Sequence, residues 1–288
     1  MFKTLGIALC ALTVVTGSAV AQALPEYLDI GRVQVRGDKT KEYEDSIKKM
    51  AEVNRKYKGD RWIALGTEYG DFGTLTFSSS RENLAAVETA AGAFMKALTE
   101  VLGTMGDKLL RDLGAWSSSY HTELRHRRWD LSVNAPSNAA DLAKVVGESR
   151  WVRLLKVDLK PGKNPEYIDA WKGFQTELAQ VQPRVTALVS EASTGTPALY
   201  VAVYYKSLAE MDAQVAGARK ALASESYQNL TRVTGNTVSM SNWELNRIRP
   251  ELSCPPDEIV NVDPTFWKPK PTPAAKPKLD TADRKAAK

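Results

Sequence analysis

The chain has 288 residues, 43% hydrophobic and 25% charged, which is ordinary for globular protein and predicts about two domains of roughly 100–150 residues each. The formal net charge of +5 is concentrated at the ends, because residues 268–288 carry seven Lys or Arg against two Asp and the first 23 residues carry only Lys3. Residues 24–267 are left with a charge of −1, which excludes a broad basic surface for a nucleic acid backbone.

Residues 1–23 have the pattern of a secretory signal peptide. Lys3 precedes an apolar run over residues 5–15, and small residues follow up to a processing site of the small-x-small kind. The run is shorter than the roughly 20 residues that a transmembrane helix needs. We therefore expect export to the periplasm or the extracellular space, a mature chain that begins between Gln22 and Leu24, and no transmembrane segment after processing.

The next part of the chain reads as strand, helix, two strands, helix and strand. Alternating residues predict a first strand, the spacing of Tyr43, Ile47 and Met50 predicts an amphipathic helix, and Gly70-Asp71 marks a hairpin turn. We expect Ser80 to cap the helix over residues 81–102, and a second helical segment to start at Met105. The predicted ranges are strand 32–36, helix 39–57, strands 62–68 and 72–78, helix 81–102 and strand 120–131.

The same order of elements follows a second time. Asn164-Pro165 opens a helix in which Tyr167, Trp171 and Phe174 repeat the mutual spacing of the first apolar stripe, and Ser207 caps a later helix. The predicted ranges are strand 154–159, a helix from 164, strands 186–191 and 198–205, a helix from 207 to 222, a short helix around 227–233 and strand 238–249.

A ten-residue motif occurs in both copies. Residues 123–132 (ELRHRRWDLS) return as residues 244–253 (ELNRIRPELS) at an ungapped offset of 121, with the Glu, both Leu, the Arg at the sixth position and the Ser retained. Such a repeat predicts two copies of one β-α-β-β-α-β unit, over residues 30–133 and 150–253. The predicted fold class is α+β: two tandem ferredoxin-like units whose sheets pack face to face as an intrachain pseudo-dimer.

On this order of elements and this repetition, residues 30–253 resemble the dimeric α/β-barrel superfamily, which includes antibiotic-biosynthesis-monooxygenase-like, EthD-like and NIPSNAP-like proteins. The resemblance implies helices outside the two sheets and a cavity, between sheet and helices, that takes hydrophobic or aromatic small molecules. We expect Leu124 and Leu245 to be buried at equivalent positions.

The last segment differs in composition. From Pro255, and most clearly after Lys268, proline alternates with lysine, which disfavours helix and strand. Residues 255–288 are predicted to be a disordered Pro/Lys-rich tail. One interpretation is a solubilising terminus; the alternative is a tether with weak contact to an anionic surface. No specific nucleic acid partner is expected.

Charged residues of the motif are candidates for a structural network. The strand over residues 120–131 carries polar side chains on both faces, so a buried face needs ion pairs. The repeated positions Glu123 with Glu244, and Arg128 with Arg249, are therefore expected to form an interior or rim charge network, and a structural role is favoured over a catalytic one.

No motif identifies a catalytic residue or a cofactor. His121 and His126 are five apart on a strand and point to opposite faces, so no metal site is expected. Some relatives of this fold bind haem, but the second copy has no histidine for the proximal ligand, so no cofactor is expected. Cys254 is the single cysteine after processing, which leaves no internal disulfide.

Aromatic residues indicate a ligand pocket instead. The candidate pocket residues are Trp62, Tyr200, Tyr204 and Trp243, with the polar side chains of His126 and Arg247. Core packing is the competing interpretation for the aromatic residues, and a solvated strand end for His126 and Arg247.

Two functions remain open from the sequence. The preferred one is an exported non-catalytic binding or interaction protein for a small hydrophobic or aromatic ligand. The alternative is a cofactor-free monooxygenase or isomerase of the dimeric α/β-barrel type, with His126 or a tyrosine as base. The fold by itself does not choose between them.

Overall fold

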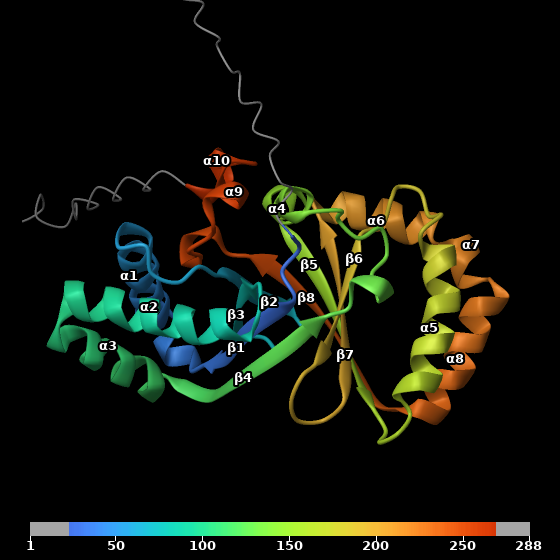
Figure 1. The fold of residues 1–288 in the computed structure, drawn as a ribbon, viewed down its shortest axis with the longest axis horizontal. Coiled ribbons are helices and arrows are strands. Elements are labelled where there is room, and N and C mark those ends of the chain that lie inside the picture. Colours follow the sequence, from blue (N-terminus) through green and yellow to red (C-terminus); the bar gives the residue numbers. More distant parts are fainter. Residues whose placement is uncertain (1–22, 269–288) are drawn as a thin grey trace, which may run out of the picture.

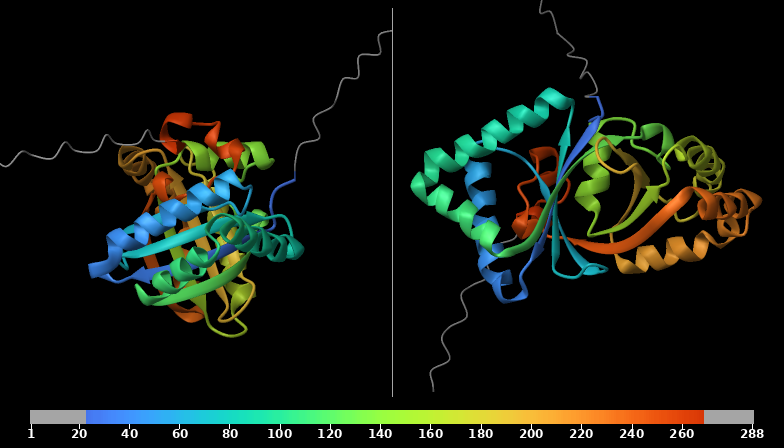
Figure 2. Two further views of the ribbon diagram at one scale, coloured as in Figure 1. Left: turned by 90° about the vertical axis from the view of Figure 1, so that its left-hand side faces the viewer. Right: turned by 90° about the horizontal axis from the view of Figure 1, so that it is seen from below.

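The computed structural model describes residues 23–268, and their strands form one closed antiparallel barrel (Figures 1 and 2). The strand order around the barrel is β1-β3-β2-β8-β5-β7-β6-β4. Residues 1–22 of the expected signal peptide and residues 269–288 of the expected tail lie outside the described residues. The strands are β1 (Tyr27–Val35), β2 (Ile63–Tyr69), β3 (Thr74–Arg81), β4 (Ser117–Arg127), β5 (Trp151–Leu159), β6 (Ala187–Ala192), β7 (Ala198–Tyr205) and β8 (Val238–Ile248).

The two halves of the barrel have the same strand order. The first half runs β4-β1-β3-β2 and the second β8-β5-β7-β6, each with antiparallel neighbours only. The halves are hydrogen-bonded to each other at both edges, through β2 with β8 and β4 with β6. The expectation of two sheets packed face to face did not include this edge pairing, which closes them into one barrel, so that each described strand is paired at both edges.

The helices surround the barrel in three groups (Figure 1). One group lies outside the first half, one lies outside the second half, and the third lies at one end of the barrel. They are α1 (Thr40–Lys56), α2 (Leu84–Leu102) and α3 (Thr104–Ala115); α5 (Asn164–Leu178), α6 (Leu208–Gly217), α7 (Arg219–Leu222) and α8 (Glu225–Thr237); and α4 (Ala139–Glu148), α9 (Asp257–Val260) and α10 (Pro264–Trp267). No helix among residues 23–268 has the length and hydropathy to cross a membrane.

Local signals placed most helices correctly. The predicted stripe on α1 is buried, and the Ser207 side chain accepts a hydrogen bond from the Glu210 backbone N–H at 3.1 Å, which confirms that cap. The cap of α2 was predicted wrongly at Ser80. Asn83 accepts the bond from Ala86 instead, because Ser80 is still paired with Leu28 of β1.

The repeated motif covers the end of the last strand of each half, β4 or β8, and the turn that follows it. After β4 and β8 the chain forms short 3-10 helices, η2 (Trp129–Leu131) and η3 (Pro250–Leu252). Ser132 accepts a hydrogen bond from the Val189 N–H at 2.9 Å, and Ser253 accepts one from the Ala64 N–H at 2.8 Å. The retained leucines of the turns, Leu131 and Leu252, are fully buried, whereas Leu124 and Leu245 are both half-buried and not buried as expected.

The predicted disordered tail begins too early. Residues 257–267 form α9 and α10, and the side chain of Trp267 is 2% exposed. Its indole N–H donates to the Gly147 carbonyl of α4 at 3.0 Å. The prolines of this segment favour an extended tail, but the apolar side chains of Val260 and Trp267 are buried at the end of the barrel.

Candidate active site

The six candidate pocket residues are not brought together. Tyr200 and Tyr204 point into the barrel, where they contact Arg125 and Arg127 of β4 across the intervening strand β6. The other four lie apart from them. Trp62 packs in the first helix layer under α2. On the outside of the barrel, Trp243 is half-exposed under Arg153, His126 is half-exposed beside Glu191, and Arg247 is exposed over Trp151.

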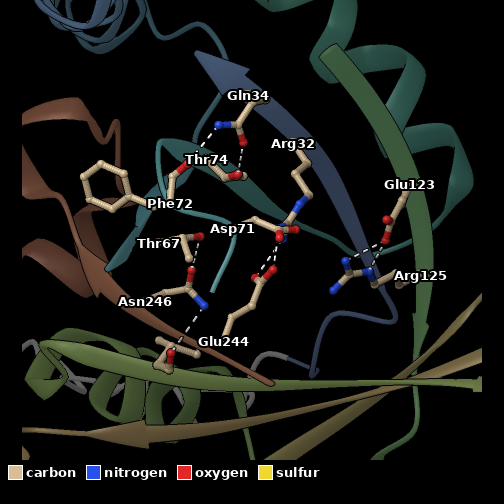
Figure 3. A network of polar contacts seen from close by, with 11 residues as sticks. Arg32, Gln34, Thr67, Asp71, Phe72, Thr74, Glu123, Arg125, Glu244 and Asn246 are labelled. Carbon is tan, nitrogen blue, oxygen red and sulfur yellow. Dashed lines mark hydrogen bonds and ion pairs between the residues drawn. The ribbon is translucent and has the colours of Figure 1, made fainter. Parts of the chain in front are cut away.

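The interior of the barrel holds paired charges (Figure 3). Arg32 of β1 donates to Glu244 of β8 at 2.8 Å, and because β3 and β2 lie between these strands the pair spans the interior. Glu123 accepts from Arg125 at 2.8 Å. Burial acts to raise the pKa of Glu123, but the charge of Arg125 and its hydrogen bond outweigh burial, so the pKa is lowered.

The repeated arginines lie at the strand ends and pair with other partners. Arg128 contacts Asp130 at 2.8 Å and Glu191 at 2.7 Å. Arg249 contacts Glu251 at 2.5 Å and Glu44 at 2.8 Å. Each repeated arginine therefore bonds the acidic residue two positions later and one carboxylate from another element, whereas the repeated glutamates bond arginines inside the barrel.

A cavity lies between the first half of the barrel and the helices α1, α2 and α3 that cover it. Its volume is about 690 Å³, which falls in the range of small-molecule sites. Ala91 of α2 and Gly31 of β1 are small residues in its lining, while the corresponding layer of the second half is packed with Trp171, Phe174 and Tyr227. The apolar lining comprises Ile47, Met50, Trp62, Phe77, Ala91, Phe94, Met95, Leu110 and Leu113.

Arg81 and two carboxylates form the polar end of this cavity. Arg81, at the end of β3, is 7% exposed and donates to both oxygens of Asp60, at 2.7 and 2.8 Å. It also donates to one oxygen of Asp29 at 3.0 Å. Burial acts to lower the pKa of Arg81, but the bonds with Asp60 and Asp29 raise it, so the guanidinium stays charged.

Two tyrosines flank the cavity. Burial raises the pKa of Tyr43 to about 12, so its hydroxyl is neutral and acts as a hydrogen-bond donor near neutral pH. Tyr120 lies over Gly31, where a Cβ would be 3.2 Å from the tyrosine hydroxyl. Burial and the charge of Asp29 raise the pKa of Tyr120 as well.

Asp29 is the best-placed proton acceptor in this cavity. Asp60 has both oxygens bound by Arg81, the tyrosines are poor bases, and the proposed base His126 lies outside the cavity. Asp29 is not among the predicted site residues, because the predicted first strand begins at Arg32, whereas β1 begins at Tyr27. An acidic residue inside the strand segment Tyr27–Val35 was the available signal.

The described residues bring no group of three or more potential metal ligands together. No family model matches the chain, and no curated protein matches it. Solved structures do match, and their likeness concerns the fold.

An anthrone oxidase-like protein matches with a TM-score of 0.53 and 11% identity, over 80% of this chain and 94% of that one. A putative monooxygenase from Fusobacterium nucleatum subsp. nucleatum matches with a TM-score of 0.50 and 11% identity, over 78% and 93%. A chlorite dismutase variant from Candidatus Nitrospira defluvii matches at 0.46 with 9% identity, over 83% and 95%, which is too low to carry an argument.

These matches support a mixed α+β fold with a closed antiparallel barrel. They also correct the preferred function. The neighbours are named as monooxygenase and oxidase-like proteins, which favours the enzymatic alternative over the expected non-catalytic binding protein.

Proposed function

We propose that the protein is a cofactor-independent oxidase or monooxygenase that acts on a hydrophobic aromatic substrate in the cavity between α1–α3 and the barrel. The observation that carries the proposal is the polar end of that cavity, where the Asp29 carboxylate and the buried Arg81 guanidinium lie side by side at the end of an apolar space of about 690 Å³. A general base beside a fixed cation suits the removal of a proton from a carbon or oxygen acid.

The reaction we propose uses the substrate itself as the electron donor. For an anthrone, Asp29 removes a methylene proton and Arg81 stabilises the negative charge that moves onto the carbonyl oxygen. The carbanion-enolate then reduces dioxygen. One oxygen atom becomes the new carbonyl of an anthraquinone, and the other leaves as water with the two methylene hydrogens. The neighbour named as anthrone oxidase-like supports the choice of this probe.

The experiment measures dioxygen uptake and quinone absorbance with anthrone, against a blank without protein. We expect Asp29→Asn to lower kcat about 100-fold or more with little change in KM, because it removes the base and keeps the shape of the side chain. Asp71→Asn is the matched control, since Asp71 contacts Arg32 at 3.2 Å outside this cavity.

A second variant tests the location. Ala91 of α2 lines the cavity, so Ala91→Phe reduces its volume and should raise KM. A wild-type rate equal to the blank with anthrone and related acidic aromatics would contradict the proposed reaction. Full activity of a folded Asp29→Asn variant would contradict the role of Asp29.

We further propose that the two halves are tandem copies that occupy the places of the two subunits in dimeric α/β-barrel proteins. The shared strand order and the equivalent contacts of Ser132 and Ser253 support this proposal. The cavity of about 690 Å³ lies in the helix layer of the first half, and Trp171, Phe174 and Tyr227 fill the corresponding layer of the second, so we place the substrate in the first copy.

A further inference from the structure

A separate cavity lies at one end of the barrel. The helices α4 and α9 lie over this end (Figure 1). Its volume is about 240 Å³, roughly eight times the 30 Å³ or so that a water molecule occupies in the liquid. Most of its wall is apolar. The apolar side chains come from β2, β5, β8, α4 and the segment of α9: Ile63, Leu65, Val152, Ile248, Leu142, Val146 and Ile259.

Arg127 lines this cavity from the end of β4. It is 5% exposed, and no described residue gives it a carboxylate partner. Its polar contacts are the Tyr204 hydroxyl and the Ser80 hydroxyl, the latter at 3.5 Å, and its guanidinium lies 5.0 Å from the Trp129 ring. Among residues 23–268, neither its Nε–H nor the indole N–H of Trp129 finds an acceptor.

The other arginines of the barrel interior differ from Arg127 in this respect. Arg32 is bonded to Glu244 and Arg125 to Glu123, so each buried charge is neutralised. A buried cation without an anion is unfavourable, and burial lowers the pKa of Arg127 although the contact with Tyr204 opposes that change. An anion in the adjacent cavity would supply the missing partner.

We propose that this cavity binds a small hydrophobic monocarboxylate, with its carboxylate on Arg127 and its apolar chain among the side chains of β2, β8 and α4. Ser78, Ser80 and Tyr204 supply hydroxyls next to the arginine. Glu82 and Glu258 line the same cavity and are exposed at its rim. Their charges disfavour dianions, which argues for a monocarboxylate and against a phosphate.

Octanoate is the probe for this site, because its chain suits the apolar wall and its head carries one charge. Isothermal titration calorimetry on the full chain should give saturable 1:1 binding of octanoate. Octanol, which has the same chain without the charge, should bind at least tenfold more weakly. Equal affinity for octanoate and octanol, or no binding of octanoate, would overturn the proposal.

Two variants locate the site. Arg127→Met should weaken octanoate binding at least tenfold and abolish the preference over octanol, while Arg247→Met, at an exposed position outside the barrel, should leave both unchanged. Val146→Phe fills the cavity from α4 and should also weaken binding, so this variant decides if Arg127→Met fails to fold. Octanoate binding at wild-type strength in either folded cavity variant would refute the site.

The test is independent of the proposed oxidase activity. Asp29→Asn and Ala91→Phe alter the other cavity, so they should leave octanoate affinity unchanged. Loss of octanoate binding in these variants would place the carboxylate in the helix–sheet cavity and overturn this inference.

Discussion

Buried arginines and tyrosines in this barrel differ in the partners that surround their charged or hydroxyl groups. Arg125 and Arg127 are each 5% exposed and Arg32 is less deeply buried. Arg32 and Arg125 have carboxylate partners, whereas no residue among 23–268 supplies one to Arg127. Buried tyrosines show the same dependence on environment. Desolvation is the single cause that raises the pKa of Tyr167 to about 12, since no neighbouring charge contributes.

Tyr167 should make the protein less stable in alkali. Folding raises the pKa of Tyr167 from about 10 to about 12, so the folded state holds the phenol proton more tightly than the unfolded state. The contribution of this proton to the unfolding free energy is fully present below pH 10 and is lost as the pH rises to about 12. We expect Tyr167→Phe to reduce the loss of unfolding free energy over this interval by about 2–3 kcal/mol. Urea unfolding at several pH values measures it. Tyr57→Phe, at an exposed position, should follow the wild type.

At the scale of elements, the repeated motif joins the halves. The chain forms η2 after β4 and η3 after β8. At each place a serine hydroxyl accepts a hydrogen bond from the backbone of the neighbouring strand of the other half, β6 for Ser132 and β2 for Ser253. The same hydroxyls donate back to the carbonyls of Arg128 and Arg249, at 2.9 and 2.8 Å. The retained serine therefore satisfies two backbone groups at each crossing.

Ser132→Ala and Ser253→Ala should each lower the unfolding free energy by about 1–3 kcal/mol, because each leaves a buried N–H without an acceptor. The crossings lie in different parts of the barrel, so the double variant should show nearly additive losses. Equilibrium denaturation of the three variants tests this expectation. Ser241→Ala, at an exposed position on β8, is the control. Losses no larger than that of the control would show that these bonds do not hold the halves together.

For the whole molecule, the C-terminal segment contributes to the core that covers one end of the barrel. Val260 and Trp267 pack with Leu142 and Val146 of α4, over strands from both halves. The basic segment that remains, residues 269–288, carries six Lys or Arg and two Asp and lies outside the described residues.

Removal of residues 269–288 should change the unfolding free energy by no more than about 0.5 kcal/mol, whereas Trp267→Ala should lower it by about 3–5 kcal/mol. Thermal or denaturant unfolding compares the two. The truncation should also abolish any binding to anionic vesicles, and that binding in the full chain should weaken with salt. A marked loss of stability on truncation would mean that residues beyond Lys268 pack against the body.

The sequence by itself determined the order of strands and helices within each repeat, the helix stripes and the Ser207 cap, because these depend on spacings of a few residues. It also determined the repetition of the strand-ending motif, which a comparison of two segments shows, but it did not predict α4, α9 or α10. Only the tertiary structure decided which strands close the barrel, that Trp267 is buried, and that Asp29 meets Arg81 while His126 and Trp243 stay outside. Those contacts join residues far apart in the chain. Their partners depend on strand register and on the side chains that fill each helix layer, and local periodicity predicts neither of these.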